Sequence, residues 1–421
     1  MDKFIIHGGK KLKGAVQVSG AKNASLALMP AALLNTGKNK LYNTPELNDV
    51  YTMLKLLSQM GVKSNFSNHL LELDTTEITS YEAPYEHVKK MRASIYVLGP
   101  LVARYGYAKV SMPGGCAWGP RPVNLHLMAM EKLGAEITLD QGYIIAKAKK
   151  LKGNYINFDI PSVGATGNTL MAAVLAKGNT IINNAACEPE ITNLCHFLMK
   201  MGAKIEGVGT SIIEVEGVDE LHPTDIDTIP DRIEAGTLLI AGAITRSNIK
   251  VIGGITNHLH SILSKLEDSG CKLFYNKESI EINSENIEIK PVDVTTAVFP
   301  GFPTDMQAQW IAYMSLANGT SNVTDTIYTD RFNHVPELVR LGADIMVNEN
   351  TARIVGVEKL KGAKVMSTDL RASASLVLAG LAAEGVTEVL RVYHIDRGYQ
   401  RIEEKLKALG ADIERVEGSE Y

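Results

Sequence analysis

The chain has 421 residues, of which 45% are hydrophobic and 21% are charged, and its formal net charge at pH 7 is −4. A single hydrophobic core stops growing at about 250–300 residues, so we expect two domains. The slightly acidic balance excludes a broad cationic surface, and we expect no nucleic-acid partner, although a local cationic pocket remains compatible with this composition.

The N-terminal segment MDKFIIHGGKKLKG contains an apolar run that is too short for a signal peptide, and no stretch of the sequence approaches about 18 consecutive apolar residues. We therefore expect a cytoplasmic protein with no membrane partner. The four cysteines form no C-x-x-C pair, which predicts free thiols and no metal site. Three of them lie on or beside predicted helices and are expected to be small buried side chains: Cys187, Cys195 and Cys271. His258 and His260 are expected to be surface histidines, because alternate residues on a helix point apart.

A short phrase of the type LGADI recurs six times, at intervals of 68 to 73 residues. Its glycine suits the left-handed conformation that ends a helix before a strand begins. These glycines are Gly61, Gly134, Gly202, Gly270, Gly342 and Gly410. The period predicts a supersecondary unit that is repeated six times along the chain.

The third repeat shows the predicted order of elements. Residues 162–178 form a helix of small residues, 179–185 a strand, 189–202 a second helix and 203–217 a hairpin. The first helices of the six units are apolar on nearly every side, so we expect them to be buried among strands. These helices are predicted within residues 21–34, 88–104, 161–176, 230–244, 303–317 and 368–383.

Charged residues recur where these buried helices start. The aligned positions are Lys22, Arg92, Ser162, Arg232, Asp305 and Arg371. A cation in the first turn opposes the helix dipole at a cost of about 0.3–1 kcal/mol, so four such cations require a reason. Snorkelling to solvent explains one of them, whereas four together favour a shared anion-binding site formed by the helix starts of two domains.

The second repeat contains extra residues at 113–122, PGGCAWGPRP, between a strand at 108–112 and a helix at 123–134. Departures from a repeated scaffold are typical of functional loops, and Cys116 lies in this one. Neighbouring arginines favour its thiolate, so Cys116 is a candidate nucleophile or proton donor. Pro122 suits the first helical position, and the inward face of the helix is expected to comprise Leu125, Met128, Ala129 and Leu133.

Eight segments together resemble the enolpyruvyl transferases over the whole chain. They are GAKNASL at 20–26, MRASIYVLGPLVAR at 91–104, PGGCAWGPRPVNLH at 113–126, SVGAT at 162–166, GFPTDMQAQ at 301–309, DRFNHVPEL at 330–338, DLRASASLVLAGL at 369–381 and HIDRGYQRIEEKL at 394–406. The resemblance implies an α/β fold of two inverted α/β barrel-like domains, each built from three repeats with buried helices. It places 1–20 and 230–421 in one domain, with Asp305, Arg371 and Arg397, and 21–229 in the other, with the Cys116 loop.

The resemblance also implies an activity, namely transfer of the enolpyruvyl group of phosphoenolpyruvate to the 3′-hydroxyl of UDP-N-acetylglucosamine with release of phosphate. This reaction is the first committed step of peptidoglycan synthesis, and so serves cell-wall biogenesis, cell shape and cell division. The small-molecule partners are these two substrates, no cofactor is implied, and a monomer is expected. The alternatives are a 3-phosphoshikimate enolpyruvyl transferase and a paralogue that has lost catalysis. The cysteine loop disfavours the first of these.

Site residues follow from the same resemblance. The implied catalytic residues are Cys116, Asp305, Lys22 and Arg397, and Cys116 is also the residue that forms a phosphoenolpyruvate adduct and reacts with fosfomycin. The implied phosphoenolpyruvate ligands are Lys22, Asn23, Arg121, Arg331, Asp369, Arg371 and Arg397. The implied UDP-N-acetylglucosamine ligands are Asn23, Arg92, Arg121, Pro122, Val123, Asn124, Leu125, Ser162, Val163, Gly164, Asp305 and Ile327. Ile160 and Gly167 depart from the family pattern beside this last set.

Overall fold

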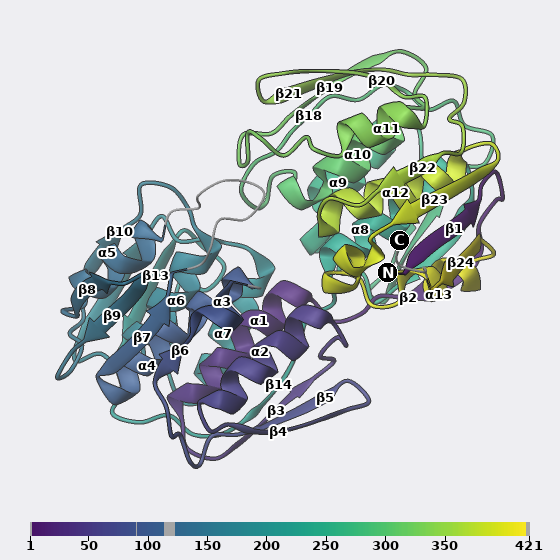
Figure 1. Cartoon of the computed structure of the whole chain (residues 1–421). Coiled ribbons are helices and arrows are strands. Elements are labelled where there is room, and N and C mark those ends of the chain that lie inside the picture. The colour runs from purple at the N-terminus through teal and green to yellow at the C-terminus, as the bar shows by residue number, and fades with distance from the viewer. Residues whose placement is uncertain (1, 90, 113–122, 418–421) are drawn as a thin grey trace. The chain divides into compact units, whose positions relative to one another are not determined.

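The computed structural model describes residues 2–89, 91–112 and 123–417 (Figure 1). Cys116, Arg121 and Pro122 therefore lie outside the described residues. The chain divides into two compact units, one formed by Met1–Ser19 with Pro230–Tyr421 and the other by Gly20–Ile229. Its described part is a mixed α/β protein with six four-stranded sheets, three in each unit.

The unit Gly20–Ile229 carries the first three repeats. Its elements are α1 (Lys22–Ala31), η1 (Ala32–Leu34), β3 (Lys38–Tyr42), α2 (Asn48–Gln59), β4 (Lys63–Ser67), β5 (Leu70–Asp74), β6 (Glu82–Ala83), α3 (Tyr85–Val88), η2 (Arg92–Val97), α4 (Leu98–Tyr105), β7 (Tyr107–Ser111), α5 (Asn124–Lys132), β8 (Glu136–Asp140), β9 (Tyr143–Lys147), β10 (Tyr155–Asn157), α6 (Val163–Ala173), β11 (Asn179–Asn183), α7 (Pro189–Lys200), β12 (Lys204–Glu206), β13 (Ile212–Glu216) and β14 (Asp225–Asp227).

The other unit carries the last three repeats. Its elements are β1 (Lys3–His7), β2 (Lys13–Gln17), α8 (Arg232–Ile244), β15 (Asn248–Ile252), α9 (Thr256–Asp268), β16 (Lys272–Tyr275), β17 (Ser279–Asn283), β18 (Val294–Thr295), η3 (Thr304–Met306), α10 (Gln307–Met314), β19 (Thr320–Thr324), α11 (Val335–Arg340), β20 (Asp344–Asn348), β21 (Thr351–Val355), β22 (Lys364–Met366), α12 (Leu370–Ala382), β23 (Val386–Leu390), η4 (Val392–Arg397), α13 (Ile402–Ala408) and β24 (Asp412–Val416).

The predicted order of helix, strand, helix and hairpin is confirmed in the third repeat by α6, β11, α7 and the pair β12–β13. A short strand before the first helix was not predicted. This strand, β10, pairs in parallel with β11, giving the sheet order β10-β11-β13-β12. Its three residues are too few for a recognisable alternation of apolar and polar side chains, so periodicity does not reveal it.

Three of these sheets use strands from distant parts of the chain. β2 pairs in parallel with β15, and β14 pairs in parallel with β3, so the first and fourth repeats exchange their leading strands. β1 lies between β23 and β24 and completes the sheet of the sixth repeat. The N-terminal strand is therefore the missing hairpin strand of the last repeat.

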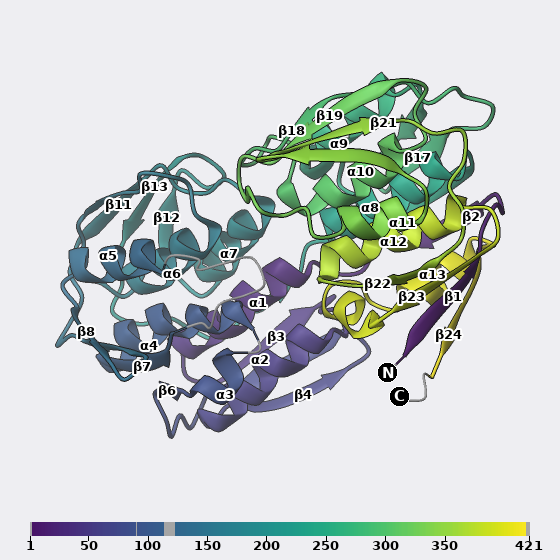
Figure 2. The ribbon, with the colours of Figure 1, turned by 45° about the horizontal axis from the view of Figure 1, so that its top comes forward.

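The prediction of buried first helices is confirmed. In the unit with the last three repeats, α8, α10 and α12 contact one another (Figure 2), and their residues are buried on almost every side. In the second repeat the single helix predicted from residue 88 is wrong, because α3, η2 and α4 replace it. Pro100 suits the first turn of a helix, and α4 accordingly begins at Leu98.

The six repeated glycines adopt the left-handed conformation that the sequence predicts. Their φ angles are 101° at Gly61, 92° at Gly134, 110° at Gly202, 102° at Gly270, 92° at Gly342 and 95° at Gly410. Each therefore ends the second helix of its repeat at no steric cost from a Cβ atom.

The predicted inward face of α5 is wrong in part. Leu125 and Met128 are only half-buried, whereas His126 and Met130 are buried together with Ala129 and Leu133. A histidine is buried here because its ring nitrogen is hydrogen-bonded, as described below.

Two of the three cysteines predicted to be buried are buried, and one of the two histidines predicted at the surface is exposed. Cys195 and Cys271 are buried, but Cys187 is only half-buried, because it lies in the loop between β11 and α7. His260 is exposed, whereas His258 is half-buried on α9.

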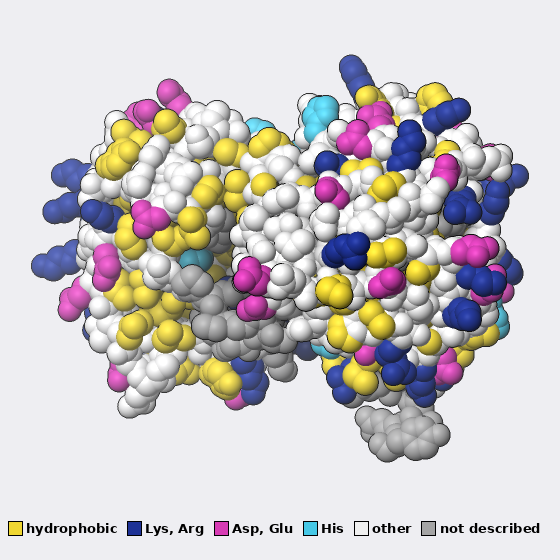
Figure 3. Space-filling model, turned by 90° about the horizontal axis from the view of Figure 1, so that it is seen from above, with side chains coloured by type: hydrophobic (Ala, Val, Ile, Leu, Met, Phe, Trp, Pro, Cys, Tyr) yellow, Lys and Arg dark blue, Asp and Glu magenta, His cyan; other side chains and the backbone are white. Residues whose placement is uncertain are grey.

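Acidic and basic side chains are interspersed on the face shown in Figure 3.

Candidate active site

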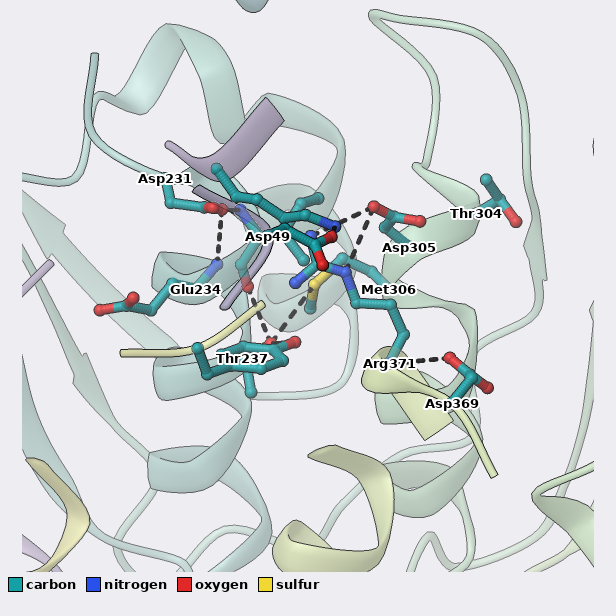
Figure 4. Close-up of polar contacts among 12 residues, drawn as sticks. Asp49, Asp231, Glu234, Thr237, Thr304, Asp305, Met306, Asp369 and Arg371 are labelled. Atoms are coloured by element: carbon teal, nitrogen blue, oxygen red, sulfur yellow. Dashed lines mark hydrogen bonds and ion pairs between the residues drawn. The ribbon is translucent and has the colours of Figure 1, made fainter. Parts of the chain in front are cut away.

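Asp305 is held between two arginines in the unit with the last three repeats. Figure 4 shows its contact with one of them, Arg371. Arg331 Nη1 lies 2.9 Å from Asp305 Oδ1, and Arg371 donates from Nε and Nη2 to Oδ2 at 3.3 and 3.2 Å. Both guanidinium groups are nearly excluded from solvent, while the carboxylate retains 27% of its exposure. These three predicted residues are therefore brought together, and the accessible member is the carboxylate.

Asp369 fixes the start of α12 and with it Arg371. Its Oδ1 accepts hydrogen bonds from the backbone N–H groups of Arg371 and Ala372, at 2.7 and 3.2 Å. An aspartate at the N-cap satisfies backbone donors and favours the positive end of the helix dipole. Arg371 follows in the first turn, where its charge is compensated by Asp305.

Asp325 was not predicted, yet it organises the segment beside Asp305. This fully buried carboxylate accepts hydrogen bonds from the hydroxyls of Thr296 and Thr304, and also from the backbone N–H of Ile327 at 2.9 Å. It therefore connects the turn that carries Asp305 with Ile327, a predicted ligand of the nucleotide sugar. Its place directly after strand β19 is the signal that could have identified it.

A buried polar layer lies below Asp305. The Tyr399 hydroxyl is 3.0 Å from Thr237 Oγ1 and accepts from Gln309 Nε2 at 3.0 Å, and the same amide donates to the Asp305 carbonyl at 2.9 Å. Arg371 packs over the Tyr399 ring, with its Cζ 5.1 Å from the ring centroid. These contacts connect α8, α10 and α12 and support the arginine–carboxylate cluster from beneath.

Arg397 ends η4 and is half-buried. Burial lowers the pKa of the neighbouring His394, and the positive charge of Arg397 lowers it further, whereas Asp369 raises it. His394 therefore interacts with both of these predicted site residues.

Lys22 begins α1 in the unit Gly20–Ile229 and forms an ion pair with Asp49 of α2. The distance between Nζ and Oδ2 is 2.8 Å, and the side chains are only 10% and 5% exposed. Asp49 was not predicted, because one carboxylate in the first turn of an amphipathic helix carries no distinctive signal. Asn23, the next predicted residue, is half-buried at the second position of α1.

The start of α6 provides the second cluster in this unit. Ser162 is the N-cap and its Oγ accepts from the Ala165 N–H at 3.3 Å, while Val163 and Gly164 form the first turn. A Cβ atom on Gly164 would lie 3.1 Å from the His126 ring, so this glycine permits α5 to approach. Val123, Asn124 and Leu125 of the predicted nucleotide site form the start of α5, and Arg92 begins η2.

His126 is neutral in this cluster. Its Nδ1 lies 2.9 Å from Asn168 Nδ2, and since that amide is a donor, Nδ1 accepts and Nε2 carries the proton. Burial lowers the pKa of His126 to about 4, with a further contribution from the positive charge of Arg92. Asn168 also accepts from the Gly99 N–H at 2.9 Å, so this side chain from the middle of α6 joins the first turns of α4 and α5.

Gly167, which departs from the family pattern, has a structural reason. A Cβ atom at this position would lie 2.7 Å from Cε1 of Tyr96. Tyr96 is buried, and its hydroxyl donates to the Val163 carbonyl at 3.3 Å. The glycine therefore gives the aromatic ring room to support the first turn of α6.

No group of three or more His, Cys, Asp or Glu side chains suited to a metal ion occurs in the part of the chain that the structure describes. In the same ranges, no helix combines the length and hydropathy needed to cross a bilayer.

Comparison with known proteins gives the class. The family model of EPSP synthase (3-phosphoshikimate 1-carboxyvinyltransferase) matches residues 6–406. The chain belongs to this family of enolpyruvyl transferases. It is 58% identical to the UDP-N-acetylglucosamine 1-carboxyvinyltransferase of Chloroherpeton thalassium, over all of this chain and 99% of the relative. It is 55% identical to the protein of the same name from Chlorobium chlorochromatii, over the full length of both chains.

Two solved structures share the fold. The enolpyruvyl transferase NikO from Streptomyces tendae matches with a TM-score of 0.87 at 24% identity, over 99% of each chain. EPSP synthase from Acinetobacter baumannii matches with a TM-score of 0.76 at 19% identity, over 99% of this chain and 100% of that one. The mixed α/β fold of this chain is thus the fold of enolpyruvyl transferases.

Proposed function

We propose that this protein is a UDP-N-acetylglucosamine 1-carboxyvinyltransferase, which transfers the enolpyruvyl group of phosphoenolpyruvate to the 3′-hydroxyl of UDP-N-acetylglucosamine and releases phosphate. The observation that carries the proposal is the partly exposed Asp305 carboxylate between Arg331 and Arg371. The full-length relatives named for this activity support it. In this proposal the protein catalyses the first committed step of peptidoglycan synthesis, in the cytoplasm and as a monomer.

The reaction requires an addition followed by an elimination. The sugar oxygen attacks C2 of phosphoenolpyruvate while C3 gains a proton, which gives a tetrahedral intermediate. Loss of phosphate from C2 and of a proton from C3 then yields the enol ether. The protein must therefore supply an acid, an acceptor for the hydroxyl proton and cations for the phosphate.

Asp305 is the proposed hydroxyl acceptor. Its two oxygens receive three guanidinium contacts, and the side chain still retains 27% of its exposure. The two guanidinium groups stabilise negative charge on the carboxylate, and a carboxylate can align the sugar hydroxyl through a hydrogen bond. Asp305 either accepts the hydroxyl proton outright or binds the hydroxyl as it reacts.

Cys116 is the proposed acid and the site of a covalent adduct with phosphoenolpyruvate. Lys22, Arg121 and Arg397 are proposed to bind the phosphate and carboxylate groups, together with Asn23, Arg331, Asp369 and Arg371. Fixed cations stabilise the departing phosphate best where water is excluded. The near-complete burial of Lys22, Arg331 and Arg371 supports this role.

The nucleotide sugar is proposed to bind at the starts of α5 and α6, where Ser162, Val163 and Gly164 present backbone N–H groups to the diphosphate. Arg92, Arg121, Pro122, Val123, Asn124, Leu125 and Ile327 complete this proposed site. The two units are proposed to be inverted α/β barrel-like domains, comprising 1–20 with 230–421 and 21–229.

The test is a direct assay of phosphate release from phosphoenolpyruvate. UDP-N-acetylglucosamine and shikimate 3-phosphate are supplied in parallel reactions, and the organic product is identified by mass spectrometry. We expect phosphate and an enolpyruvyl product only in the reaction that contains phosphoenolpyruvate and UDP-N-acetylglucosamine. Turnover with shikimate 3-phosphate would refute the proposal. So would the absence of turnover with both acceptors.

A further inference from the structure

Arg415 on strand β24 binds the residue next to Arg397. Its Nη1 and Nη2 atoms donate to the two carboxylate oxygens of Asp396, at 3.0 and 2.5 Å. Such a bidentate pair fixes both the position and the plane of the carboxylate. The exposed fractions are similar, at 27% for Arg415 and 26% for Asp396, so water partly screens the pair without separating it.

The same guanidinium also binds the other end of the segment. Arg415 Nε donates to Glu403 Oε1 at 2.7 Å, and Glu403 lies in the first turn of α13 and is nearly buried. A third contact joins Nη1 to Asp2 Oδ2 at 3.3 Å. One arginine thus connects the last turn of η4 with the start of α13, and Arg397, the last residue of η4, lies between the two anchored residues in sequence.

Arg415 is held by a rigid element. It pairs in register with Phe4 of β1, and its Cζ lies 5.0 Å from the centroid of the Phe4 ring. The sheet order is β22-β23-β1-β24, and β22 leads into the N-cap Asp369 of α12. The sheet that carries Arg415 therefore also carries the strand before Asp369 and Arg371.

The chain after Arg397 is fixed independently. A Cβ atom on Gly398 would lie 2.5 Å from Leu370 Cδ1, which shows how closely this backbone packs against α12. Tyr399 is 1% exposed, with its hydroxyl bonded to Thr237 and Gln309. The backbone on both sides of Arg397 is therefore fixed, by buried Tyr399 after it and by the Asp396 carboxylate before it.

Asp396 also carries a charge opposite to that of its neighbour. A carboxylate without another partner would attract the adjacent guanidinium and compete with an anionic substrate. Arg415 binds both oxygens of this carboxylate. Asp396 therefore stabilises the fold and does not compete with the substrate for Arg397.

We propose that Arg415 is a positioning residue: by holding Asp396 and Glu403, it orients the Arg397 side chain toward the phosphate and carboxylate of the enolpyruvyl donor. The proposal deepens the proposed function and rests on it for the identity of the donor. Arg415 itself does not touch the substrate.

The test compares four variants of the full-length protein. Arg415→Met removes the charge and keeps the stem, Asp396→Asn weakens the bidentate contact from the other side, and the double variant combines them. Lys3→Met is the control, because Lys3 forms a 2.8 Å ion pair with Glu388 on the same sheet, with similar exposures of 26% and 33%.

We expect Arg415→Met to raise the KM for phosphoenolpyruvate about tenfold, while the KM for UDP-N-acetylglucosamine changes less than about twofold. Asp396→Asn should act in the same direction, and the double variant should be no worse than the more affected single variant, because the residues act as one unit. Lys3→Met should match the wild type. A KM for phosphoenolpyruvate that stays unchanged in Arg415→Met, or a parallel rise of both KM values, would overturn the proposal.

Hydrogen–deuterium exchange in the substrate-free protein provides a readout that needs no activity. Amides in residues 393–401 should exchange faster in Arg415→Met than in Lys3→Met, while those of β22 and β23 stay protected. If the wild type is inactive on both substrates, the proposed function fails and this exchange pattern alone decides the positioning role; unchanged exchange refutes it. Should Arg415→Met not fold, Asp396→Asn decides by the same two measurements.

Discussion

Lys22 Nζ and Asp49 Oδ2 lie 2.8 Å apart in an ion pair that is almost excluded from solvent. The pair explains how a cation can begin a buried helix against the helix dipole, since a neighbouring carboxylate compensates it. Arg371 and Asp305 repeat the arrangement in the other unit. In both cases the residue that the sequence marks as unusual is stabilised by a carboxylate from another segment.

Removing one member of the Lys22–Asp49 pair should therefore be costly. We expect Asp49→Asn to lower the free energy of unfolding by about 3–5 kcal/mol, because the nearly buried Lys22 ammonium would lose this ion pair. The control is Glu77→Gln, which breaks a pair with Lys63 whose members are 76% and 72% exposed, and it should change stability by less than about 1 kcal/mol. Urea unfolding at pH 7.5 measures both, and equal effects would contradict the explanation.

Asp305→Asn should abolish most turnover. An amide keeps the shape of the side chain but is a poor proton acceptor, so we expect kcat to fall by about 100-fold to 10,000-fold. Asp330→Asn is the control, since Asp330 is exposed and immediately precedes Arg331 in sequence. Steady-state kinetics with both substrates is the measurement, and a kcat within threefold of the control, roughly the noise of context effects, would rule out the proposed role.

Cys116 should be the thiol that fosfomycin alkylates, as the family resemblance implies. The other three cysteines should not react at neutral pH, because burial raises the pKa of each thiol. The pKa of Cys195 rises to about 12. Cys116→Asp should form no adduct yet retain turnover, since a carboxylic acid can also donate a proton. Intact-mass and peptide mass spectrometry locate the adduct, and labelling of another cysteine would disprove the assignment.

His126 should make the protein less stable in acid. Its pKa is about 4 in the folded protein and 6.5 ordinarily, so the unfolded chain takes up a proton first as the pH falls. The folded state keeps its full stability above about pH 6.5, and it loses about 3 kcal/mol in total as the pH falls from 6.5 to about 4. His126→Gln, whose carbonyl can still accept from Asn168, should flatten this pH dependence in urea unfolding. An unchanged slope would show that the ring is not kept neutral.

Two of the repeated glycines should differ in their tolerance of alanine. Gly61 and Gly134 have similar φ angles of 101° and 92°, but an added Cβ would lie 2.5 Å from the Glu77 carbonyl oxygen at Gly61 and would meet nothing within 4 Å at Gly134. Gly134→Ala should cost about 1–2 kcal/mol from backbone strain alone, and Gly61→Ala should cost about 1–3 kcal/mol more. Thermal unfolding of both variants checks this order, which the reverse ranking would contradict.

The amino-acid pattern predicts much of the local structure. Helical periodicity and the repeated glycines locate the elements of each unit, because both depend on interactions within a few residues. The His126 face of α5 and the 3₁₀ segment at Arg92 were missed, since each depends on contacts or turn geometry that hydrophobic periodicity does not encode.

The candidate site divides in the same way. Asp305, Arg331 and Arg371 were predicted from the resemblance and lie together, but their supports were not predicted. Asp49 and Asp325 are isolated acidic residues in sequence, and they gain a role only when folding places them beside a cation or a turn. A carboxylate has no recognisable pattern when its partners lie in other segments.

The sequence by itself determined six repeated units with buried first helices, because apolar periodicity and helix-ending glycines are local properties of the chain. Tertiary structure alone decided that β1 completes the last repeat and that β2 and β14 exchange sheets. Strand pairing is a contact between backbones, and the side-chain pattern of a short strand states which face is buried but not which neighbour it joins.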